Sequence, residues 1–478
     1  MSTAAPGTRF KGADLGFLLM LSIGLYVAIV KPWVPELTAQ GHLVLFALII
    51  TVGMWIFKPL DMPNGISGCF FLMFALAIKV PAPNVFSGFT SSALWTLIPA
   101  LFFGFVLVKT GLGKRIGYLV IQLFKPSYPM LILAFVMIGL ALSALTPSIV
   151  VRCVIVVPIA VSVIEACNLE LKSRGSALLL LSAWAMAVIP GSGWLTGALH
   201  GPIILGMFEA VPGLKGMLNF GSYLQVMFMP TLVLAALLIV GGYFALKPDQ
   251  PLAVEKEYFK EEYRKLGAFS RDEIVSAVIL VICFLMFFTN RIHGIPDGAT
   301  VLGGLFLLTL AGVIKGPEIS SGISWDLILF IGVAMSISGV FAATEVTKWL
   351  VSVLVPVIAP LTSSPWTFAY SIMILFFILR FFDVAVFVPT MAVFIPVLPE
   401  IASHFSISPL AWVPLFVMAT NCFFLNYTNM FAMVAESIAK ERSWTPGQMS
   451  LYGIVYGLAC LVTLAIAVPY WISLGLFS

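Results

Sequence analysis

The sequence predicts an all-α protein that crosses a membrane many times, and three observations carry this prediction. Hydrophobic residues make up 61% of the 478 residues, and charged residues only 10%. Typical soluble domains contain roughly 25% charged residues. Mean hydropathy is +1.09, and the apolar residues are gathered in runs long enough to span a bilayer as helices. This composition excludes intrinsic disorder, which needs low hydrophobicity and high charge.

The remaining composition excludes several other classes. The net charge of +4 is spread over short segments and forms no basic face, so we expect no nucleic-acid partner. The six cysteines form no CxxC pair and the four histidines are scattered, so we expect neither a metal site nor a cofactor. No HExxH, GxSxG or P-loop motif is present, and we therefore expect that the protein is not an enzyme.

Eleven apolar runs are candidates for spanning helices. The first, 15–30, follows Arg9 and Lys11 and has no small-residue cleavage site, which is typical of an uncleaved signal anchor. The others are 42–57, 65–80, 93–110, 175–207, 222–246, 274–290, 299–314, 324–344, 409–434 and 447–475. Two further apolar stretches, 127–167 and 367–403, are interrupted by prolines and charges, and we interpret each as a re-entrant hairpin.

The distribution of basic residues predicts the orientation of these spans. With residues 1–14 in the cytoplasm and eleven crossings, eighteen Lys and Arg residues fall in cytoplasmic segments and five outside. This bias fits the positive-inside rule. The polar segment 247–273 is then a cytoplasmic linker, in which we expect one amphipathic helix. We expect a multi-pass protein of a bacterial inner membrane, surrounded by the lipid bilayer, with its N-terminus in the cytoplasm.

The sequence indicates two repeats, residues 15–246 and 274–478. WTLIPALFFGFV begins at Trp95 and WDLILFIGVAMS at Trp325, and Pro158 and Pro389 follow after 63 and 64 residues. Around these prolines, VRCVIVVPIAVSV aligns with FDVAVFVPTMAVF without a gap. An odd number of spans separates the halves, which makes the repeats inverted. Inverted repeats with interrupted helices are typical of secondary transporters.

The repeat alignment places two arginines near the predicted hairpin tips. It pairs Arg152 with Asp383, and it sets Ser148-Ile149-Val150 against Leu379-Arg380-Phe381. An arginine at membrane depth costs at least ~2.5 kcal/mol, and its planar fork matches a carboxylate or sulfonate. We therefore predict substrate binding by Arg152, Arg380 and Asp383. Two alternatives stay open, namely an internal Arg380–Asp383 pair and an Arg152 side chain that reaches the membrane interface.

Two polar, interrupted segments complete the candidate site. VIPGSGWLTGALHGPI, from Val188, is rich in Gly and Pro and predicts unwound backbone, which is tolerated at membrane depth only inside protein or beside a cavity. Its polar side chains are Ser192, Thr196 and His200, and His200 is either a contact for a proton or substrate or a neutral residue at a helix end. ATNCFFLNYTNMFAM, from Ala419, contains Asn421, Asn426, Thr428 and Asn429. We expect Asn426 and Thr428 to face substrate, and a network between helices is the alternative.

Several of these segments resemble the divalent anion/sodium symporter (DASS) family. They are VKTGLGKRIGYLVIQLF, ALTPSIVVRCVIVVPIA, EEYRKLGAFSRDEIVSAVIL and WDLILFIGVAMSISGV. The resemblance runs from about residue 40 to about residue 470. It implies di- or tricarboxylate or sulfate transport, a homodimer formed by a scaffold domain, and an elevator-type movement of the hairpins and broken helices. It also implies substrate contacts at the first hairpin turn, from Thr146 and Ser148, and TPS followed by Arg152 resembles the carboxylate-exchanger branch.

The chain departs from the family at both hairpin tips. The family carries Ser-Asn-Thr there, and this chain keeps only Ser148 of the first triplet and none of the second. The side chains that replace them offer no ligand to Na+, so we expect Arg380 to stand where a sodium ion would offset substrate charge. We predict a transporter of small organic anions, first of all dicarboxylates, that works as an exchanger or ion-independent carrier. A Na+- or H+-coupled symporter of carboxylate, sulfonate or sulfate is the alternative, and a membrane sensor or assembly subunit is the candidate from another class.

Overall fold

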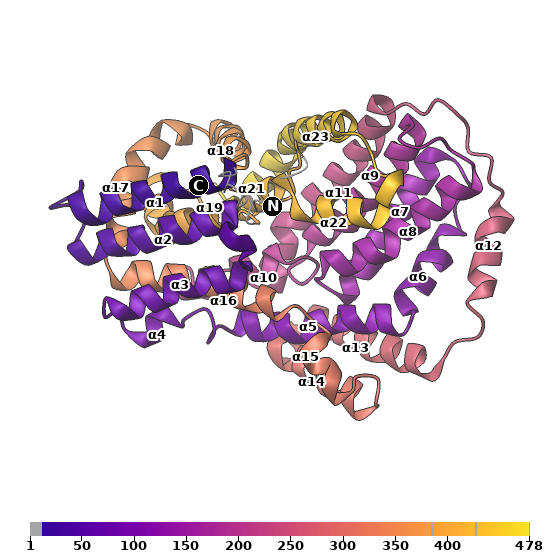
Figure 1. Cartoon of the computed structure of the whole chain (residues 1–478), viewed down its shortest axis with the longest axis horizontal. Coiled ribbons are helices and arrows are strands. Elements are labelled where there is room, and N and C mark those ends of the chain that lie inside the picture. Colours follow the sequence, from indigo (N-terminus) through magenta and orange to yellow (C-terminus); the bar gives the residue numbers. More distant parts are fainter. Residues whose placement is uncertain (1–11, 384–385, 426–427, 478) are drawn as a thin grey trace, which may run out of the picture.

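The computed structural model describes residues 12–383, 386–425 and 428–477, and it is built from α-helices joined by short turns (Figure 1). Most of the predicted cytoplasmic N-terminus, including Arg9 and Lys11, lies outside the described residues. Within the described part of the chain, eleven helices are long and apolar enough to cross a membrane. The prediction of an all-helical polytopic protein with about eleven spanning helices is confirmed.

The helices follow one another through both halves of the chain. Those of the first half are α1 (Gly12–Val30), α2 (Ala39–Phe57), α3 (Asn64–Ala77), α4 (Ala82–Val85), α5 (Ser92–Lys109), α6 (Leu112–Ile121), α7 (Tyr128–Leu145), α8 (Ile149–Ala166), α9 (Arg174–Val188), α10 (His200–Ala210) and α11 (Phe220–Ala245). Those of the linker and second half are α12 (Lys256–Lys265), α13 (Arg271–His293), α14 (Asp297–Leu310), α15 (Gly316–Ser321), α16 (Trp325–Ala343), α17 (Val346–Ile358), α18 (Pro365–Leu379), α19 (Val388–Phe394), α20 (Leu398–Phe405), α21 (Trp412–Thr420), α22 (Met430–Ala439) and α23 (Pro446–Ser473).

The eleven candidate spans are not the eleven that the sequence predicted. The runs 65–80 and 299–314 form helices of only 14 residues, α3 and α14, which reach about 21 Å at 1.5 Å per residue. The run 409–434 is divided between α21 and α22. In their place stand α7, α8 and the segment Val388–Phe405, each of 18 residues. Apolar composition alone does not show where a helix ends. The sequence therefore did not predict that each arm of the first hairpin is as long as a spanning helix.

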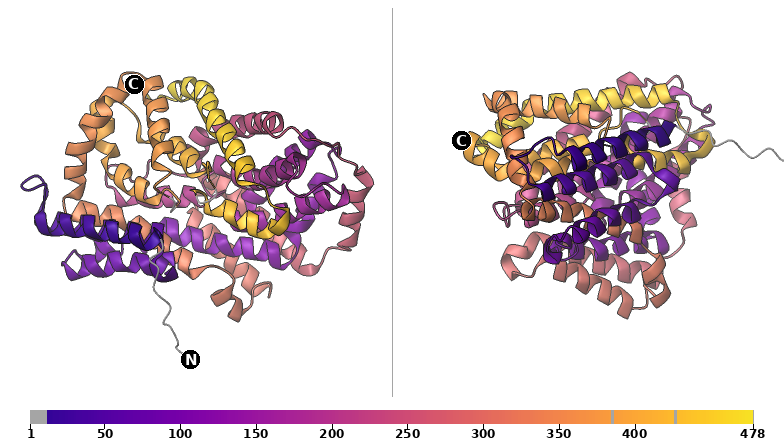
Figure 2. Two further views of the ribbon diagram at one scale, coloured as in Figure 1. Left: turned by 45° about the horizontal axis from the view of Figure 1, so that its top comes forward. Right: turned by 60° about the vertical axis from the view of Figure 1, so that its left-hand side comes forward.

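The order of elements recurs in the two halves. The series α5, α6, α7–α8, α9–α10 and α11 returns as α16, α17, α18–α20, α21–α22 and α23. The last members of the two series pack against each other, and the indole of Trp471 donates to the backbone carbonyl of Val226 (3.0 Å). On the left of Figure 1, α1 and α2 lie side by side (see also Figure 2). The inverted orientation of the repeats stays a prediction.

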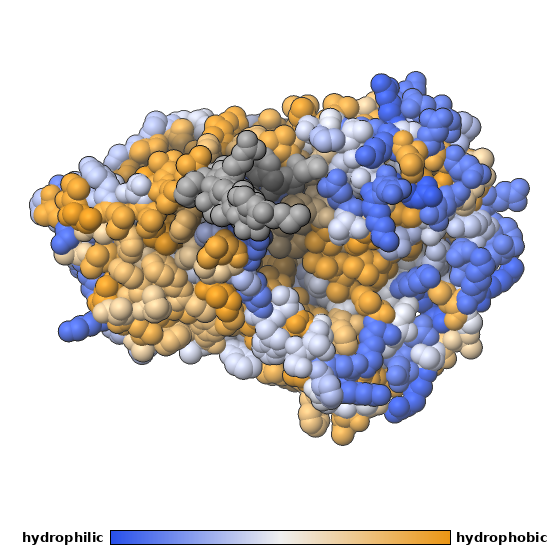
Figure 3. All heavy atoms as spheres, in the orientation of Figure 1, coloured by the Kyte–Doolittle hydropathy of each residue, from blue (hydrophilic) through white to orange (hydrophobic). Residues whose placement is uncertain are grey.

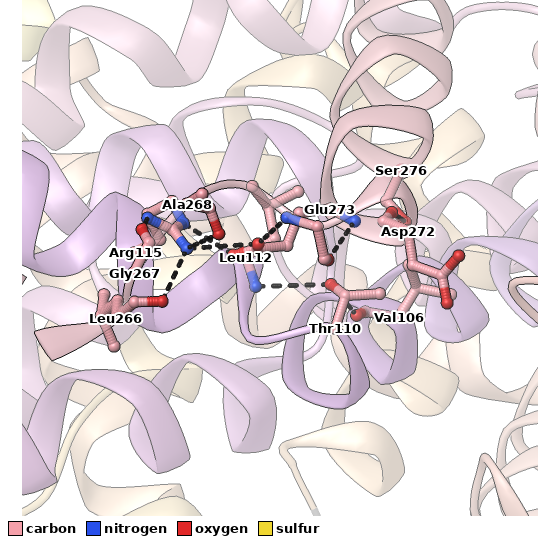
Figure 4. Close-up of polar contacts among 11 residues, drawn as sticks. Val106, Thr110, Leu112, Arg115, Leu266, Gly267, Ala268, Asp272, Glu273 and Ser276 are labelled. Carbon is pink, nitrogen blue, oxygen red and sulfur yellow. Dashed lines mark hydrogen bonds and ion pairs between the residues drawn. The ribbon is translucent and has the colours of Figure 1, made fainter.

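The linker is fastened to the first half by one buried arginine (Figure 4). Arg115 of α6 donates through Nε to Oε1 of Glu273 (2.7 Å) and through Nη1 to the carbonyl of Gly267 (3.0 Å). Its guanidinium also lies 4.3 Å from the ring centre of Phe269. The hydrogen bond with Glu273 raises the pKa of Arg115 above its ordinary value, so this group stays charged at physiological pH. We call Arg115 and Glu273 the linker clamp.

Hydrophilic and hydrophobic surfaces are separated along the molecule. Figure 3 shows hydrophilic residues gathered at the end that carries α6, α8 and α12, whereas the surface over α1 and α2 is largely hydrophobic. Within α12, Lys260 and Glu257 form an exposed pair at 2.8 Å, and Phe259 is buried. The linker helix is therefore amphipathic, and it lies at the end that the basic residues assign to the cytoplasm.

Candidate functional site

The first break in a spanning helix lies between α9 and α10. The α-helix ends at Val188, a 3-10 turn covers Pro190–Gly193, and α10 begins only at His200. A Cβ atom on Gly197 would lie 2.2 Å from the carbonyl oxygen of Gly191. Only glycine therefore allows the two sides of the break to approach this closely. The whole stretch is buried, as unwound backbone at membrane depth must be.

Arg152 holds this break against the first hairpin tip. The side chain is fully buried, and Nε donates to the carbonyl of Ala187 (2.5 Å) at the end of α9. Nη1 donates to the carbonyls of Thr146 (2.9 Å) and Gly197 (2.5 Å). In the described part of the chain Nη2 has no hydrogen-bond partner. The alternative in which Arg152 reaches the membrane interface is wrong, because its cation is instead bound by carbonyls that the break leaves unpaired.

The hydroxyl groups of the first hairpin turn shape the turn itself. Thr146 Oγ1 accepts from the amide of Ser148 (3.1 Å) and lies 3.4 Å from the carbonyl of Ala100 in α5. Ser148 Oγ accepts from the amide of Val151 (3.3 Å) and so caps α8. A Cβ on Gly104 of α5 would lie 2.6 Å from Thr146 Oγ1. The predicted turn is therefore at 146–148, and both predicted substrate contacts already carry structural hydrogen bonds.

A polar connection joins the breaks of the two repeats. Asn421, at the end of α21, donates through Nδ2 to Oγ of Ser192 (2.8 Å). The same hydroxyl lies 3.4 Å from Nε2 of His200, which is fully buried. Asn429 reaches back toward the carbonyl of Cys422 (3.4 Å) and caps α22 through the amide of Phe431. The prediction of candidate binding residues did not include Asn421, although the density of polar side chains in this apolar segment was its signal.

His200 is a fully buried side chain of the candidate site. Arg152 and Arg380 are both close enough to act electrostatically on its imidazole. Nδ1 of His200 has no hydrogen-bond partner within the residues that the structure describes.

The second hairpin tip is built around Arg380 and Asp383. Arg380 is 2% exposed and donates through Nη1 to the backbone carbonyl of Asp383, while its Nε has no partner among the described residues. Oδ2 of Asp383 accepts from the amide (2.9 Å) and hydroxyl (2.8 Å) of Thr390. Asp383 therefore caps α19 and contacts Arg380 through its main chain. Arg380 is also within electrostatic range of Cys422, in the second break.

The remaining predicted site residues have different surroundings. The hydroxyl of Thr428 is buried and donates to the carbonyl of Leu425 (2.7 Å), so it stabilises its own turn. Asn426 lies outside the described residues. Thr196 is buried with a hydroxyl that no described group bonds, and it lines a cavity of about 10 Å³ beside Pro147 and Phe284. That volume is close to the space one water molecule needs.

The two arginines of the candidate site carry hydrogen-bond donors that the described residues leave unsatisfied. Nη2 of Arg152 and Nε of Arg380 are buried donors without a partner in the described structure. An unsatisfied donor costs about 1–3 kcal/mol, and more on a charged group. A ligand with negatively charged oxygens would satisfy such donors, because hydrogen bonds between ionised partners are the strongest. The arrangement therefore suits an anion.

Comparison with known proteins agrees with this chemistry. The family described as the sodium:sulfate symporter transmembrane region matches residues 14–477. The chain belongs to this family. The chloroplast dicarboxylate transporters 1 and 2 of Spinacia oleracea are 24% and 23% identical to it, over 61% and 70% of this chain and 52% and 60% of theirs. The chain thus spans about half the length of the curated relatives it matches.

A solved structure shows the same fold over almost the whole chain. The YdaH transporter of Alcanivorax borkumensis is similar with a TM-score of 0.58, over 97% of this chain and 98% of that one. The two sequences are only 12% identical. The likeness therefore concerns the fold alone, and the site must be argued from the residues of this chain.

Proposed function

We propose that this protein is a secondary transporter of small organic anions, and that a dicarboxylate binds where the two hairpin tips meet the two breaks. One observation carries the proposal. Two buried arginines both act electrostatically on His200, and each has an N–H group without a partner in the described structure. A dianion can engage both arginines, one carboxylate to each. The names of the relatives in Spinacia, which are dicarboxylate transporters, support this substrate class.

Exchange, or transport without a coupling ion, follows from the same charges. Arginine cannot lose its proton under physiological conditions, so the empty site keeps two fixed cations in a medium of low dielectric constant, of which Arg380 is partly offset by the carboxylate of Asp383. Bound substrate offsets those charges, and the loaded site should therefore cross the membrane more readily than the empty one. The family resemblance supports an elevator-type movement, a homodimer and an inner-membrane location with a cytoplasmic N-terminus.

Proteoliposomes test this proposal directly. We would measure uptake of radiolabelled succinate, with and without unlabelled succinate inside, in sodium and in choline buffer. We expect uptake that requires internal succinate and is equal in both buffers. Uptake driven by sodium alone, or by an imposed pH gradient alone, would replace exchange by symport. Absence of uptake for carboxylates, sulfonates and sulfate would overturn transport of small anions.

Arg380 is the residue whose replacement tests the site. We expect Arg380→Ala and Arg380→Lys to lower exchange at least ~10-fold, because a hydrogen bond to a charged group contributes about 1.5–3 kcal/mol and lysine lacks the planar fork. Arg271→Ala is the matched control, since that side chain is 74% exposed at the start of α13. Normal exchange by Arg380→Ala, in protein that elutes as a single species, would remove Arg380 from the binding site.

A further inference from the structure

A groove separate from the anion site runs between α8 and the junction of α5 with α6. Its volume is about 310 Å³, and its lining includes Val108, Lys114 and Tyr118 on one side and Val154 and Pro158 on the other. Val154 and Pro158 are exposed, one turn apart on α8, whereas Arg152 on the same helix is fully buried. The two features therefore occupy different faces of α8.

The lining of this groove has an apolar length and one cationic end. Val108 and Val154 are 45% and 40% exposed, so the walls offer bare hydrocarbon. Lys114 is also exposed, and no carboxylate of the described residues forms an ion pair with it. It lies one residue from Arg115, which reaches the linker, and its Nζ is 5.8 Å from the ring centre of Tyr118. Its ammonium group therefore lies near Tyr118, which also lines the groove.

The linker helix closes the groove at its polar end. The hydroxyl of Tyr258 in α12 donates to the carbonyl of Ser162 (3.3 Å), which lines the groove. Gly113 and Gly117 bring α6 close to α8, because a Cβ on either would lie within 2.5 Å of an isoleucine of α8. These contacts close the groove along its length, whereas its side stays open at the exposed side chains of Val108 and Val154.

We propose that an anionic phospholipid occupies this groove, with an acyl chain along Val108 and Val154 and its phosphate at Lys114. Basic pockets between membrane helices on the cytoplasmic side are a known form of lipid recognition. Lysine suits this position, because its apolar stem follows the wall while the ammonium group reaches the headgroup level. The lipid would fill the space between α6, which is held by the linker clamp, and the hairpin arm that carries Arg152.

Native mass spectrometry of the full-length protein in detergent tests the proposal. Dioleoyl phosphatidylglycerol would be titrated against dioleoyl phosphatidylcholine. We expect tighter binding of phosphatidylglycerol, and Lys114→Gln should weaken it about fivefold, since one basic residue near a membrane surface contributes ~1 kcal/mol. Lys125→Gln, an exposed lysine just beyond α6, should bind phosphatidylglycerol like the unaltered protein.

Two further arms separate the groove from other sources of binding. Val154→Trp fills the apolar length and should reduce the binding of both lipids, whereas loss of charge at Lys114 should affect phosphatidylglycerol alone. The lipid assignment would be overturned by displacement of phosphatidylglycerol with millimolar inorganic phosphate, which would indicate a phosphate site. It would equally be overturned if Lys114→Gln and Val154→Trp both bound phosphatidylglycerol with unchanged affinity.

Discussion

Replacing Arg115 with Met should open the linker clamp, and the structure allows the size of the effect to be worked out. The side chains of Arg115 and Glu273 are 4% and 6% exposed, and two nitrogen–oxygen contacts of 2.7 and 3.2 Å join them. Removing one partner of a buried pair costs about 3–5 kcal/mol, because the other charge stays buried without compensation. Glu273 would keep only its capping contact with the amide of Ser270 (2.7 Å) among those described here.

Hydrogen exchange of the amides in residues 264–276 measures this cost. Since each 1.4 kcal/mol changes a population tenfold, we expect Arg115→Met to accelerate exchange there by at least about 100-fold. Lys265→Met is the control, because its pair with Glu262 involves a lysine side chain that is 68% exposed and such pairs contribute only about 0–1 kcal/mol. Acceleration below tenfold by Arg115→Met would refute the reasoning.

The double variant Arg115→Met with Glu273→Leu separates charge burial from packing. An apolar pair in place of a buried ion pair is often neutral or stabilising. We therefore expect this variant to recover most of the lost protection, although the carbonyls of Leu266, Gly267 and Ala268 lose their donor. Protection as low as in Arg115→Met would show that those carbonyl contacts, and not the charge of Glu273, hold the linker.

Two further predictions concern the breaks, and a third is their control. Gly197→Ala should abolish exchange and lower the melting temperature. Its Cβ would lie 2.2 Å from the carbonyl oxygen of Gly191, and such overpacking costs about 1–3 kcal/mol. Equal melting temperatures of the variant and the unaltered protein would contradict this. Gly303→Ala in α14, with no atom within 4 Å of the new Cβ, should leave both measurements unchanged. Asn421→Ala should slow exchange several-fold by removing its bond to Ser192, and unaltered initial rates would show that the two breaks act independently.

The breaks could be predicted from the sequence because their causes are local. Proline removes an amide donor and glycine permits close backbone contact, and both crowd the stretch between Val188 and His200, where the structure interrupts the helix. The position of the first hairpin turn, at Thr146 and Ser148, came instead from the resemblance to the family. The short lengths of α3 and α14 could not be predicted, since composition is nearly the same in a 14-residue helix and in a spanning one.

The partners of the site residues could not be predicted from the sequence. The bond between Asn421 and Ser192 joins residues 229 positions apart, and the carbonyls that bind Arg152 become available only because α9 unwinds. The resemblance to the family assigned Ser148 to substrate, and the polar segment from Ala419 assigned Thr428 to it, but both hydroxyls bond neighbouring backbone groups. Short hydroxyl side chains at helix ends find such local partners readily, and sequence spacing does not distinguish the two uses.

The three carbonyls bound by Arg152 have a consequence for the kinetics of any movement. The hairpin tip, the end of α9 and the break cannot separate without stripping a permanent cation of its ligands inside the membrane. In the elevator-type movement proposed above, this barrier would keep the three segments together as one rigid unit. A bound anion would then move together with half of its binding site, which stays assembled. The slow step would be the movement of this unit past α5, where Thr146 packs against Gly104. The site would not have to form again after each crossing.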